Sequence, residues 1–344
     1  MKIKLSYIIP IFNGEKYLVR CLDSLFIQGL SNDEYEVICI DDCSKDGSVK
    51  ILRDYASKRD NVHLILHEKN KRTSTSCNEG LLSAQGEYIW IIGQDDWIEP
   101  NWAKRILEQA QKENLDVVPF NYNRVNADGS TLLSNVEVFP NSPLLNGNEY
   151  VRKYFYDTAG IYLLGYEWRA IYRKQFLIDK GISFPQNVLF EDTTFLFKAI
   201  WYADKIKSVN EFIYNYRLND KSVTDYEQRY KGYLTYEFSF KTSAEIIDLA
   251  SQISDEHVVS LLNDAAKKSL KSFAYKVIPM SRSERAIFYD NVNSNRNDII
   301  HIYQMLPWLY RLLLLPVLGK QIALCLKPIF QFRHLFVKRL YINK

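Results

Sequence analysis

The chain has 344 residues, of which 47% are hydrophobic and 25% are charged, and its formal net charge is +3. These proportions exclude collagen-like, low-complexity and disordered classes, and the length predicts one large domain with an appendage or two modest domains. Five cysteines without CxxC spacing indicate neither a disulfide framework nor a structural zinc site, so we expect a reducing, cytoplasmic location.

The first 125 residues alternate strand and helix signals. Short apolar runs rich in β-branched residues predict buried strands at 6–12, 35–40, 62–66, 88–92 and 116–120. Apolar residues at helical spacing, with capping and terminating residues, predict helices at 17–26, 46–55, 78–85 and 100–112. This alternation predicts a mainly parallel sheet with helices on both faces, which binds ligands beyond the carboxyl ends of its strands.

The rest of the chain has a looser pattern. Turn signals and aromatic-rich segments continue to about residue 224, and apolar stripes then predict helices over 226–305. Seven Lys or Arg residues and no acidic residue follow Asp298, whereas residues 1–298 include 37 basic and 41 acidic residues. The tail at 305–344 also combines Leu and aromatic residues without the roughly 20 consecutive apolar residues that cross a bilayer.

A basic, aromatic tail of this type can lie in an anionic membrane interface. The alternative is a pair of helices packed on the body of the protein with a solvated basic face. We expect peripheral association with the membrane, because charges of one sign are unusual for a merely solvated face.

The glycine positions exclude two classes of nucleotide site. No two glycines are separated by one residue, so the glycine-rich dinucleotide turn is absent from the sequence. Gly319-Lys320 is followed by Gln321, so the P-loop is absent as well.

Acidic residues collect where two predicted strands end. Asp41 and Asp42 follow the second strand, and Asp95 and Asp96 follow the fourth. Adjacent carboxylates repel one another unless a cation or several donors offset their charge. Carboxylate oxygens suit Mg²⁺ or Mn²⁺, particularly where a substrate diphosphate completes the coordination. The sequence therefore predicts a metal-bridged nucleotide at this edge of the sheet.

Several segments resemble, in order and spacing, the nucleotide-sugar domain of glycosyltransferase family 2. They are SYIIPIFN at 6–13, DDCSKDGS at 41–48, NEGL at 78–81 followed by AQGEY at 84–88, and DDW at 95–97. Further segments are similar to the acceptor-side signatures of that family: WRAIYR at 168–173, FEDTTF at 190–195, YR at 216–217 and SVT at 222–224. The resemblance covers roughly residues 4–225.

The resemblance implies an α/β fold of the GT-A type, which is Rossmann-like, followed by a C-terminal helical region. We expect a glycosyltransferase domain at 1–225, with a nucleotide-sugar half at 1–125 and an acceptor half at 126–225. A helical appendage at 226–304 and the basic membrane-associating tail at 305–344 would follow. The implied reaction is inverting transfer from a nucleotide diphosphate sugar, commonly a UDP-sugar.

The resemblance also implies residue roles on the nucleotide side. Phe12 stands where family members stack on or flank the base, and Pro10 and Asn13 shape the same loop. Asp42 stands where a carboxylate accepts a hydrogen bond from the base. Asp95 and Asp96 match the carboxylates that contact the ribose and the metal.

On the acceptor side, Asp192 matches the catalytic base, and Glu191 beside it binds or positions the acceptor. A sugar hydroxyl is a poor nucleophile at neutral pH, so a carboxylate must take its proton as the new bond forms. The alternative for this pair is capping of the helix that begins at Thr193, which is compatible with catalysis. Trp97 and Trp168 adjoin these motifs and are candidates for acceptor contact or for packing.

The sequence departs from the family at two positions. An acid that many members carry is replaced by Gly93, so no Asp-x-Asp remains and metal coordination rests largely on Asp96. An Arg of many members is replaced by Cys77, and either Lys71 or Arg72 is expected to supply the missing cation. Arg217 or Lys221 is expected to help stabilise the diphosphate.

We therefore expect a membrane-associated enzyme of surface polysaccharide or lipid-linked oligosaccharide synthesis, on the inner face of the cell membrane. Its partners would be a nucleotide-sugar donor, Mn²⁺ or Mg²⁺ and a glycan or lipid-linked acceptor, with no nucleic acid. One alternative is a non-catalytic nucleotide- or carbohydrate-binding protein on the same scaffold, against which the intact acids argue. Another is a sugar nucleotidyltransferase, whose glycine- and lysine-rich triphosphate loop is missing near Pro10.

Overall fold

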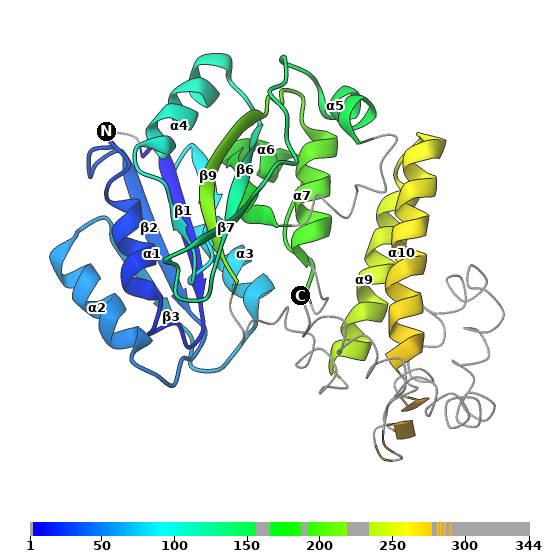
Figure 1. Cartoon of the computed structure of the whole chain (residues 1–344), viewed down its shortest axis with the longest axis horizontal. Helices are drawn as coiled ribbons and strands as arrows, with labels where there is room; N and C mark the ends of the chain where they lie inside the picture. The colour runs from blue at the N-terminus through cyan, green and yellow to red at the C-terminus, as the bar shows by residue number, and fades with distance from the viewer. Residues whose placement is uncertain are drawn as a thin grey trace. The chain divides into compact units, whose positions relative to one another are not determined.

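The computed structural model describes residues 3–155, 166–186, 191–218 and 234–276, with isolated residues between 281 and 290. The chain divides into two compact units, 1–186 with 191–222 and 187–190 with 223–344. Figure 1 shows both units, with most of their helices and strands labelled.

The first half of the first unit alternates strands and helices, as the sequence predicts. The strands are β1 (Leu5–Ile11), β2 (Tyr35–Asp41), β3 (Val62–Leu66) and β4 (Tyr88–Ile91), and they pair in parallel in the order β3-β2-β1-β4. The helices between them are α1 (Leu18–Leu25), α2 (Ser48–Lys58) and α3 (Thr73–Ser83). Helix α3 begins at Thr73 rather than at the predicted residue 78. Small side chains, among them Ser74 and Ser76, form its buried face and carry no apolar periodicity in the sequence.

The second half of the unit extends the same sheet in a mixed arrangement. Its strands are β5 (Trp97–Ile98), β6 (Val117–Val125), β7 (Leu132–Val136), β8 (Ala170–Arg173) and β9 (Val209–Arg217). Its helices are α4 (Trp102–Glu113), α5 (Gly147–Tyr154), the short 3-10 helix η2 (Glu167–Arg169), α6 (Lys174–Asp179) and α7 (Glu191–Tyr202).

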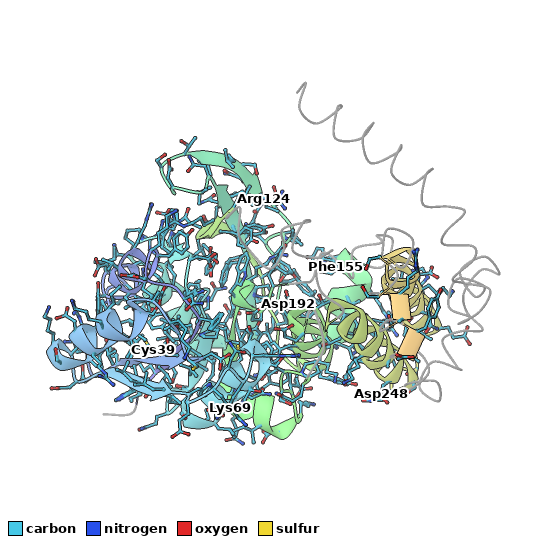
Figure 2. All side chains as sticks on the ribbon, turned by 90° about the horizontal axis from the view of Figure 1, so that it is seen from below. Cys39, Lys69, Arg124, Phe155, Asp192 and Asp248 are labelled. Atoms are coloured by element: carbon cyan, nitrogen blue, oxygen red, sulfur yellow. The ribbon has the colours of Figure 1, made fainter. Side chains whose placement is uncertain are left out.

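The sheet runs in the order β3-β2-β1-β4-β8-β6-β9-β5, and β7 pairs with β6. Strand β8 is antiparallel to β4 and to β6, whereas β9 is parallel to β6. The predicted parallel arrangement thus describes the first half, and the acceptor-side segments add antiparallel strands to it. Figure 2 shows the β6–β7 hairpin, with Arg124 labelled, projecting from the rest of the unit.

Helices cover both faces of the sheet because alternate strand residues point to opposite sides. Tyr7 and Ile9 of β1 share one buried cluster with the apolar residues of α1, α2 and α4, which include Leu22, Leu52 and Ile106. On the other face, Ile8 lies against α3, where a Cβ on Gly80 would approach the Ile8 Cγ2 atom to 2.4 Å. Only glycine permits this close contact between helix and strand.

The carboxyl ends of the first strands meet at one edge of the sheet. The register places Asp41 of β2 beside Ile11 of β1 and Leu66 of β3, and β4 runs parallel on the other side of β1. Pro10 is half-buried near the end of β1. The loops that follow β1, β2 and β4 therefore start side by side.

The second unit contains the helices α9 (Leu234–Ser251) and α10 (Glu256–Lys276), which pack against each other. Ile246 and Leu249 of α9 and Val258 and Leu262 of α10 are buried, as the predicted apolar stripes require. In the part of the chain that the structure describes, no helix is long and apolar enough to span a bilayer. The predicted basic tail at 305–344 lies outside the described residues.

Candidate active site

The loop after β1 is tied to the two neighbouring loops. The Phe12 amide donates to Gln94 Oε1 at 2.9 Å, and Gln94 Nε2 donates back to the Phe12 carbonyl at 3.0 Å. Asn13, with φ 52°, donates its amide to Ser44 Oγ at 2.9 Å and accepts from the Lys45 amide at 2.8 Å. These bonds hold the Phe12 ring 45% exposed, where a flat ligand can stack on it.

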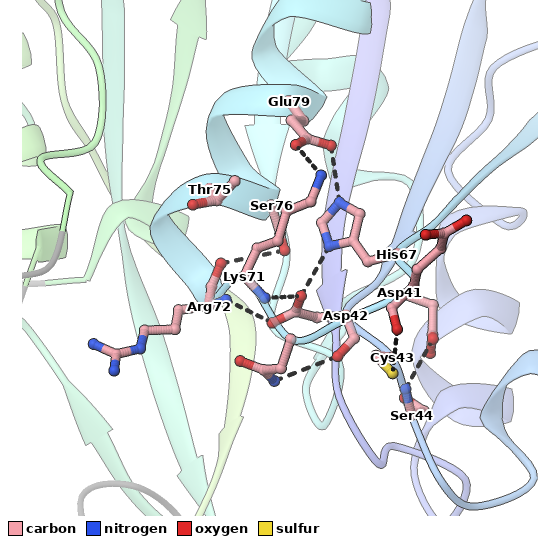
Figure 3. A network of polar contacts seen from close by, with 12 residues as sticks. Asp41, Asp42, Cys43, Ser44, His67, Lys71, Arg72, Thr75, Ser76 and Glu79 are labelled. Carbon is pink, nitrogen blue, oxygen red and sulfur yellow. Dashed lines mark hydrogen bonds and ion pairs between the residues drawn. The ribbon is translucent and has the colours of Figure 1, made fainter. Parts of the chain in front are cut away.

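The Asp42 carboxylate is buried at the end of β2 and organises the segment at 67–72 (Figure 3). It accepts from the Lys71 amide at 2.6 Å and from the Arg72 amide at 2.8 Å, and its Oδ1 lies 2.8 Å from His67 Nδ1. A carboxylate offers about four acceptor positions, so one position is left for a donor on a ligand. Arg72 adopts φ 73° and ψ 164°, a conformation that costs about 1–3 kcal/mol in residues other than glycine.

Asp96 is only 2% exposed, and its carboxylate links the loop after β4 to strand β9. Its Oδ2 accepts from the Tyr214 hydroxyl at 2.7 Å, and its Oδ1 accepts from the Arg217 amide at 2.9 Å. Burial, together with the negative charge of Asp95, raises the pKa of Asp96 well above its ordinary value.

The same junction explains why glycine occupies position 93. The Gly93 amide donates to the Tyr214 hydroxyl at 2.9 Å, and a Cβ on Gly93 would lie 2.7 Å from Asp96 Oδ2. The acid that many family members carry at this position therefore does not fit beside the Asp96–Tyr214 pair.

Arg217 holds the backbone of the loop that contains Asp95 and Asp96. Arg217 is 5% exposed. Its Nε donates to the Asp95 carbonyl at 2.8 Å, and its Nη1 donates to the Ala127 carbonyl at 3.1 Å. Its guanidinium lies about 5 Å from the ring centroids of Tyr17 (5.0 Å) and Trp97 (5.1 Å). This placement gives no support to the predicted contact between Arg217 and a diphosphate, and it makes Trp97 a packing anchor of the loop.

The donor atoms at this edge suit a hard divalent cation. In the described part of the chain, no group of three or more His, Cys, Asp or Glu residues is arranged to hold a metal ion. Magnesium is commonly bound by one or two carboxylates that substrate phosphates complete, and Asp95 and Asp96 offer such a pair. Asp95 is half-buried, whereas both oxygens of Asp96 already accept hydrogen bonds from the protein.

The predicted base, Asp192, lies at the N-terminus of α7 and is labelled in Figure 2. Its two oxygens accept from the amides of Tyr166 at 3.0 Å and Thr193 at 2.9 Å. Burial raises the pKa of Asp192, and burial with the adjacent Asp192 charge raises the pKa of Glu191 to about 7. A carboxylate of raised pKa is a more effective proton acceptor at neutral pH.

A stack of aromatic rings connects Asp192 to Asp96. The Tyr166 ring stacks on Trp168 with centroids 5.1 Å apart, and Trp168 stacks on Tyr214 at 4.2 Å with an interplanar angle of 10°. Tyr166 donates its amide to Asp192, and Tyr214 donates its hydroxyl to Asp96. Asp192 thus contacts the backbone of Tyr166 and Asp96 contacts the hydroxyl of Tyr214, and Trp168, which is 5% exposed, packs between those two rings.

One carboxylate of this site has no counterpart in the sequence analysis. Burial raises the pKa of Glu167 well above its ordinary value, and the negative charges of Asp192, Glu191 and Asp96 contribute in that order. Glu167 therefore lies close enough to Asp96 and to the Glu191–Asp192 pair for their charges to raise its pKa. Its only sequence signal is its place directly before Trp168.

The departure at position 77 also has a structural explanation. Cys77 is fully buried, and burial raises its pKa well above the ordinary value, with contributions from the charges of Glu167, Glu191 and Asp192. Lys71, one of the two proposed substitutes for the family Arg, is paired through its Nζ with Glu79 Oε1 at 2.8 Å. Lys71 and Arg72 both stay candidates for the missing cation.

Two further side chains of α3 were missed by the sequence analysis. Asn78 donates through Nδ2 to the Phe184 carbonyl and accepts through Oδ1 from the Phe184 amide, both at 2.9 Å. Phe184 in turn stacks on Phe195 of α7 with centroids 4.0 Å apart. Glu79 contacts His67. Asn78 and Glu79 stand inside the NEGL segment that carried the resemblance, but nothing in the sequence shows their partners.

The first half of the unit is a parallel α/β sheet with acids at its strand ends. The second half adds antiparallel strands and brings in the acidic pair Glu191–Asp192. This is the architecture of a GT-A nucleotide-sugar domain. The sequence model of glycosyl transferase family 2 matches residues 6–163. Residues 6–163 of the chain are therefore similar to a family 2 glycosyltransferase domain.

Individual relatives agree with this assignment. The uncharacterized glycosyltransferase EpsJ of Bacillus subtilis is 30% identical over 229 residues, which are 64% of this chain and 62% of EpsJ. This chain thus spans about three fifths of that relative. The crystal structure of Staphylococcus aureus TarS 1–349 in complex with UDP superposes with a TM-score of 0.64 at 21% identity, covering 91% of this chain and 86% of that one.

A more distant solved structure also shares the fold. It is the mannosyltransferase PcManGT from Pyrobaculum calidifontis in complex with GDP-mannose and Mn²⁺, with a TM-score of 0.51 at 14% identity. It covers 96% of this chain and 88% of that one. At these identities both structural likenesses show the GT-A fold.

Proposed function

We propose that this protein is an inverting glycosyltransferase that moves a sugar from a UDP-sugar to a hydroxyl group of a glycan or lipid-linked acceptor in surface polysaccharide synthesis. The observation that carries the proposal is the aromatic stack that joins the metal-side acid Asp96 to the predicted base Asp192. Support for the polysaccharide context comes from relatives such as the poly(ribitol-phosphate) β-N-acetylglucosaminyltransferase TarS, which is 29% identical over 214 residues.

On the donor side, Phe12 stacks on the base, and Asp42 accepts a hydrogen bond from it. Pro10 and Asn13 keep the loop in place, and Arg72 supplies positive charge toward the diphosphate. Arg217 acts indirectly, because its guanidinium holds the backbone of the Asp95–Asp96 loop.

We assign the metal to the same loop, where Asp95 and Asp96 are the two carboxylates. Asp96 also fixes the loop, because its oxygens accept hydrogen bonds from the Tyr214 hydroxyl and the Arg217 amide. When bound, Mn²⁺ or Mg²⁺ neutralises negative charge on the leaving diphosphate.

On the acceptor side, Asp192 takes the proton of the attacking hydroxyl group. The acceptor oxygen forms a bond to the anomeric carbon while the bond from that carbon to the diphosphate oxygen breaks, and the electron pair leaves with the diphosphate. The two amide donors on Asp192 hold its carboxylate in one orientation. Glu191 binds the acceptor beside it.

The test has two measurements. A panel of UDP-sugars is incubated with Mn²⁺ and acceptor, and transfer is measured as UDP release. The binding of UDP is measured separately in a calorimeter. Asp192→Asn should lower transfer by at least about 10²-fold while leaving the Kd for UDP within about twofold of the wild type. Transfer at the wild-type rate by this variant would remove Asp192 as the base. Asp95→Asn should weaken the metal-dependent part of UDP binding more than Glu191→Gln, which serves as the matched control.

We further propose peripheral association with the inner face of the cell membrane through residues 305–344. The support for this part is the sequence alone, namely the seven basic residues and the aromatic and Leu residues of the tail.

A further inference from the structure

His67 occupies an unusual position between two carboxylates. Its Nδ1 lies 2.8 Å from Asp42 Oδ1 and its Nε2 lies 2.8 Å from Glu79 Oε2 (Figure 3). The His67 and Asp42 side chains are 2% and 6% exposed, and Glu79 is 32% exposed. The three residues come from the segment after β3, the end of β2 and helix α3, so the contacts tie three elements together.

The geometry determines the charge of the imidazole. An ionised carboxylate can only accept hydrogen bonds, so each ring nitrogen must carry a proton to bond to its carboxylate. In a neutral imidazole, one nitrogen lone pair would face a carboxylate oxygen at 2.8 Å, and a buried contact between two acceptors is unfavourable.

The surrounding charges are consistent with an imidazolium. Asp42 and Glu79 face the ring directly, and Lys71 Nζ bonds to the other Glu79 oxygen at 2.8 Å. The bonds from Lys71 and His67 lower the pKa of Glu79, so Glu79 stays ionised. Two anions and two cations then balance within the network, and the Arg72 amide adds a neutral donor to Asp42.

We propose that His67, as an imidazolium, is a positioning residue for the nucleotide: it fixes the Asp42 carboxylate in the orientation that receives the base and locks the segment at 67–72 onto α3. This inference rests on the proposed function, because it takes Asp42 to be the base acceptor. His67 itself does not contact the reacting atoms.

Two substitutions separate the contacts of the ring. The side-chain amide of His67→Asn can replace the Nδ1 donor toward Asp42. The side-chain amide of His67→Gln can replace the Nε2 donor toward Glu79, and Asp42 then receives no hydrogen bond from residue 67. With UDP and Mg²⁺ in a calorimeter at pH 7, His67→Gln should bind about tenfold more weakly than the wild type, about 1.4 kcal/mol. His67→Asn should stay within about threefold of the wild type. The kcat at saturating donor should change little in either variant.

The pH dependence provides a readout that a merely structural histidine would not give. The ratio of the Kd values of the wild type and His67→Asn should rise about threefold or more from pH 6 to pH 8.5, because only the wild type carries a titratable ring at position 67. Nitrogen-15 spectra at pH 7 should show both ring nitrogens protonated for the one histidine signal that His67→Asn removes.

Equal UDP affinity of His67→Gln and the wild type, a Kd ratio that does not change with pH, or a neutral His67 ring at pH 7 would each overturn the inference. If His67→Gln fails to fold, the pH ratio and the nitrogen-15 spectra still decide, because they need only the wild type and His67→Asn. Failure of the wild type to bind UDP would count against the proposed function instead.

Discussion

Replacing Gly93 with alanine should damage the acidic loop although the change adds a single methyl group. The Cβ would lie 2.7 Å from Asp96 Oδ2 and 3.2 Å from the Tyr214 hydroxyl. The backbone at Gly93 is not in the left-handed region, so alanine meets no conformational penalty there. Any effect must therefore come from the contact with the Asp96–Tyr214 pair.

The size of the effect follows from what has to move. Asp96 cannot swing aside freely, because the Arg217 amide holds its other oxygen at 2.9 Å. Restoring an ordinary contact distance lengthens the bond from Tyr214, and a buried hydrogen-bonding group left without its partner costs about 1–3 kcal/mol. We expect a loss of about 2 kcal/mol in the free energy of unfolding, which lowers Tm by about 4–8 °C for a unit of this size.

Thermal unfolding of Gly93→Ala, Tyr214→Phe and the double variant measures this coupling directly. The double variant should be less destabilised than the sum of the two single variants, because removal of the hydroxyl eliminates the bond that the methyl group disturbs. UDP release by Gly93→Ala should fall by about tenfold or more as the loop shifts. A Tm within about 1 °C of the wild type, or strictly additive effects, would refute the steric explanation of this glycine.

Three further predictions follow from other contacts. Asn78→Ala should lower kcat by about tenfold or more with little change in UDP affinity, because Phe184 loses the bonds that position α7; a proportional loss of UDP binding would contradict this. Glu191→Gln should raise the free energy of unfolding by at most about 3 kcal/mol, and with it Tm, at pH 8 but not near pH 4, because burial and the Asp192 charge raise the pKa of Glu191 to about 7. The stabilisation that protonated Glu191 gives the wild type is present below the unfolded-state pKa of Glu191 and is lost as the pH rises through about 7. A Tm difference between the variant and the wild type that does not change with pH would argue against the raised pKa. Deletion of residues 305–344 should shift the protein from the membrane to the soluble fraction, and unchanged partitioning would favour packing of the tail.

Helices and strands of the first half could be predicted closely from the sequence, because apolar periodicity and turn residues are local signals. The same local reading placed Asp42, Asp95 and Asp96 at one edge, since parallel strands end together. It missed the start of α3, where small polar residues form the buried face. It also did not predict β8, whose antiparallel insertion between β4 and β6 depends on partners far along the chain.

The sequence by itself determined the family resemblance and the list of acids. Only the tertiary structure decided which of them face one another: the Tyr166–Trp168–Tyr214 stack that joins Asp192 to Asp96, and the two carboxylates around His67. The physical reason is that residue periodicity records burial along one element, whereas contacts between distant residues depend on how the whole sheet twists and packs.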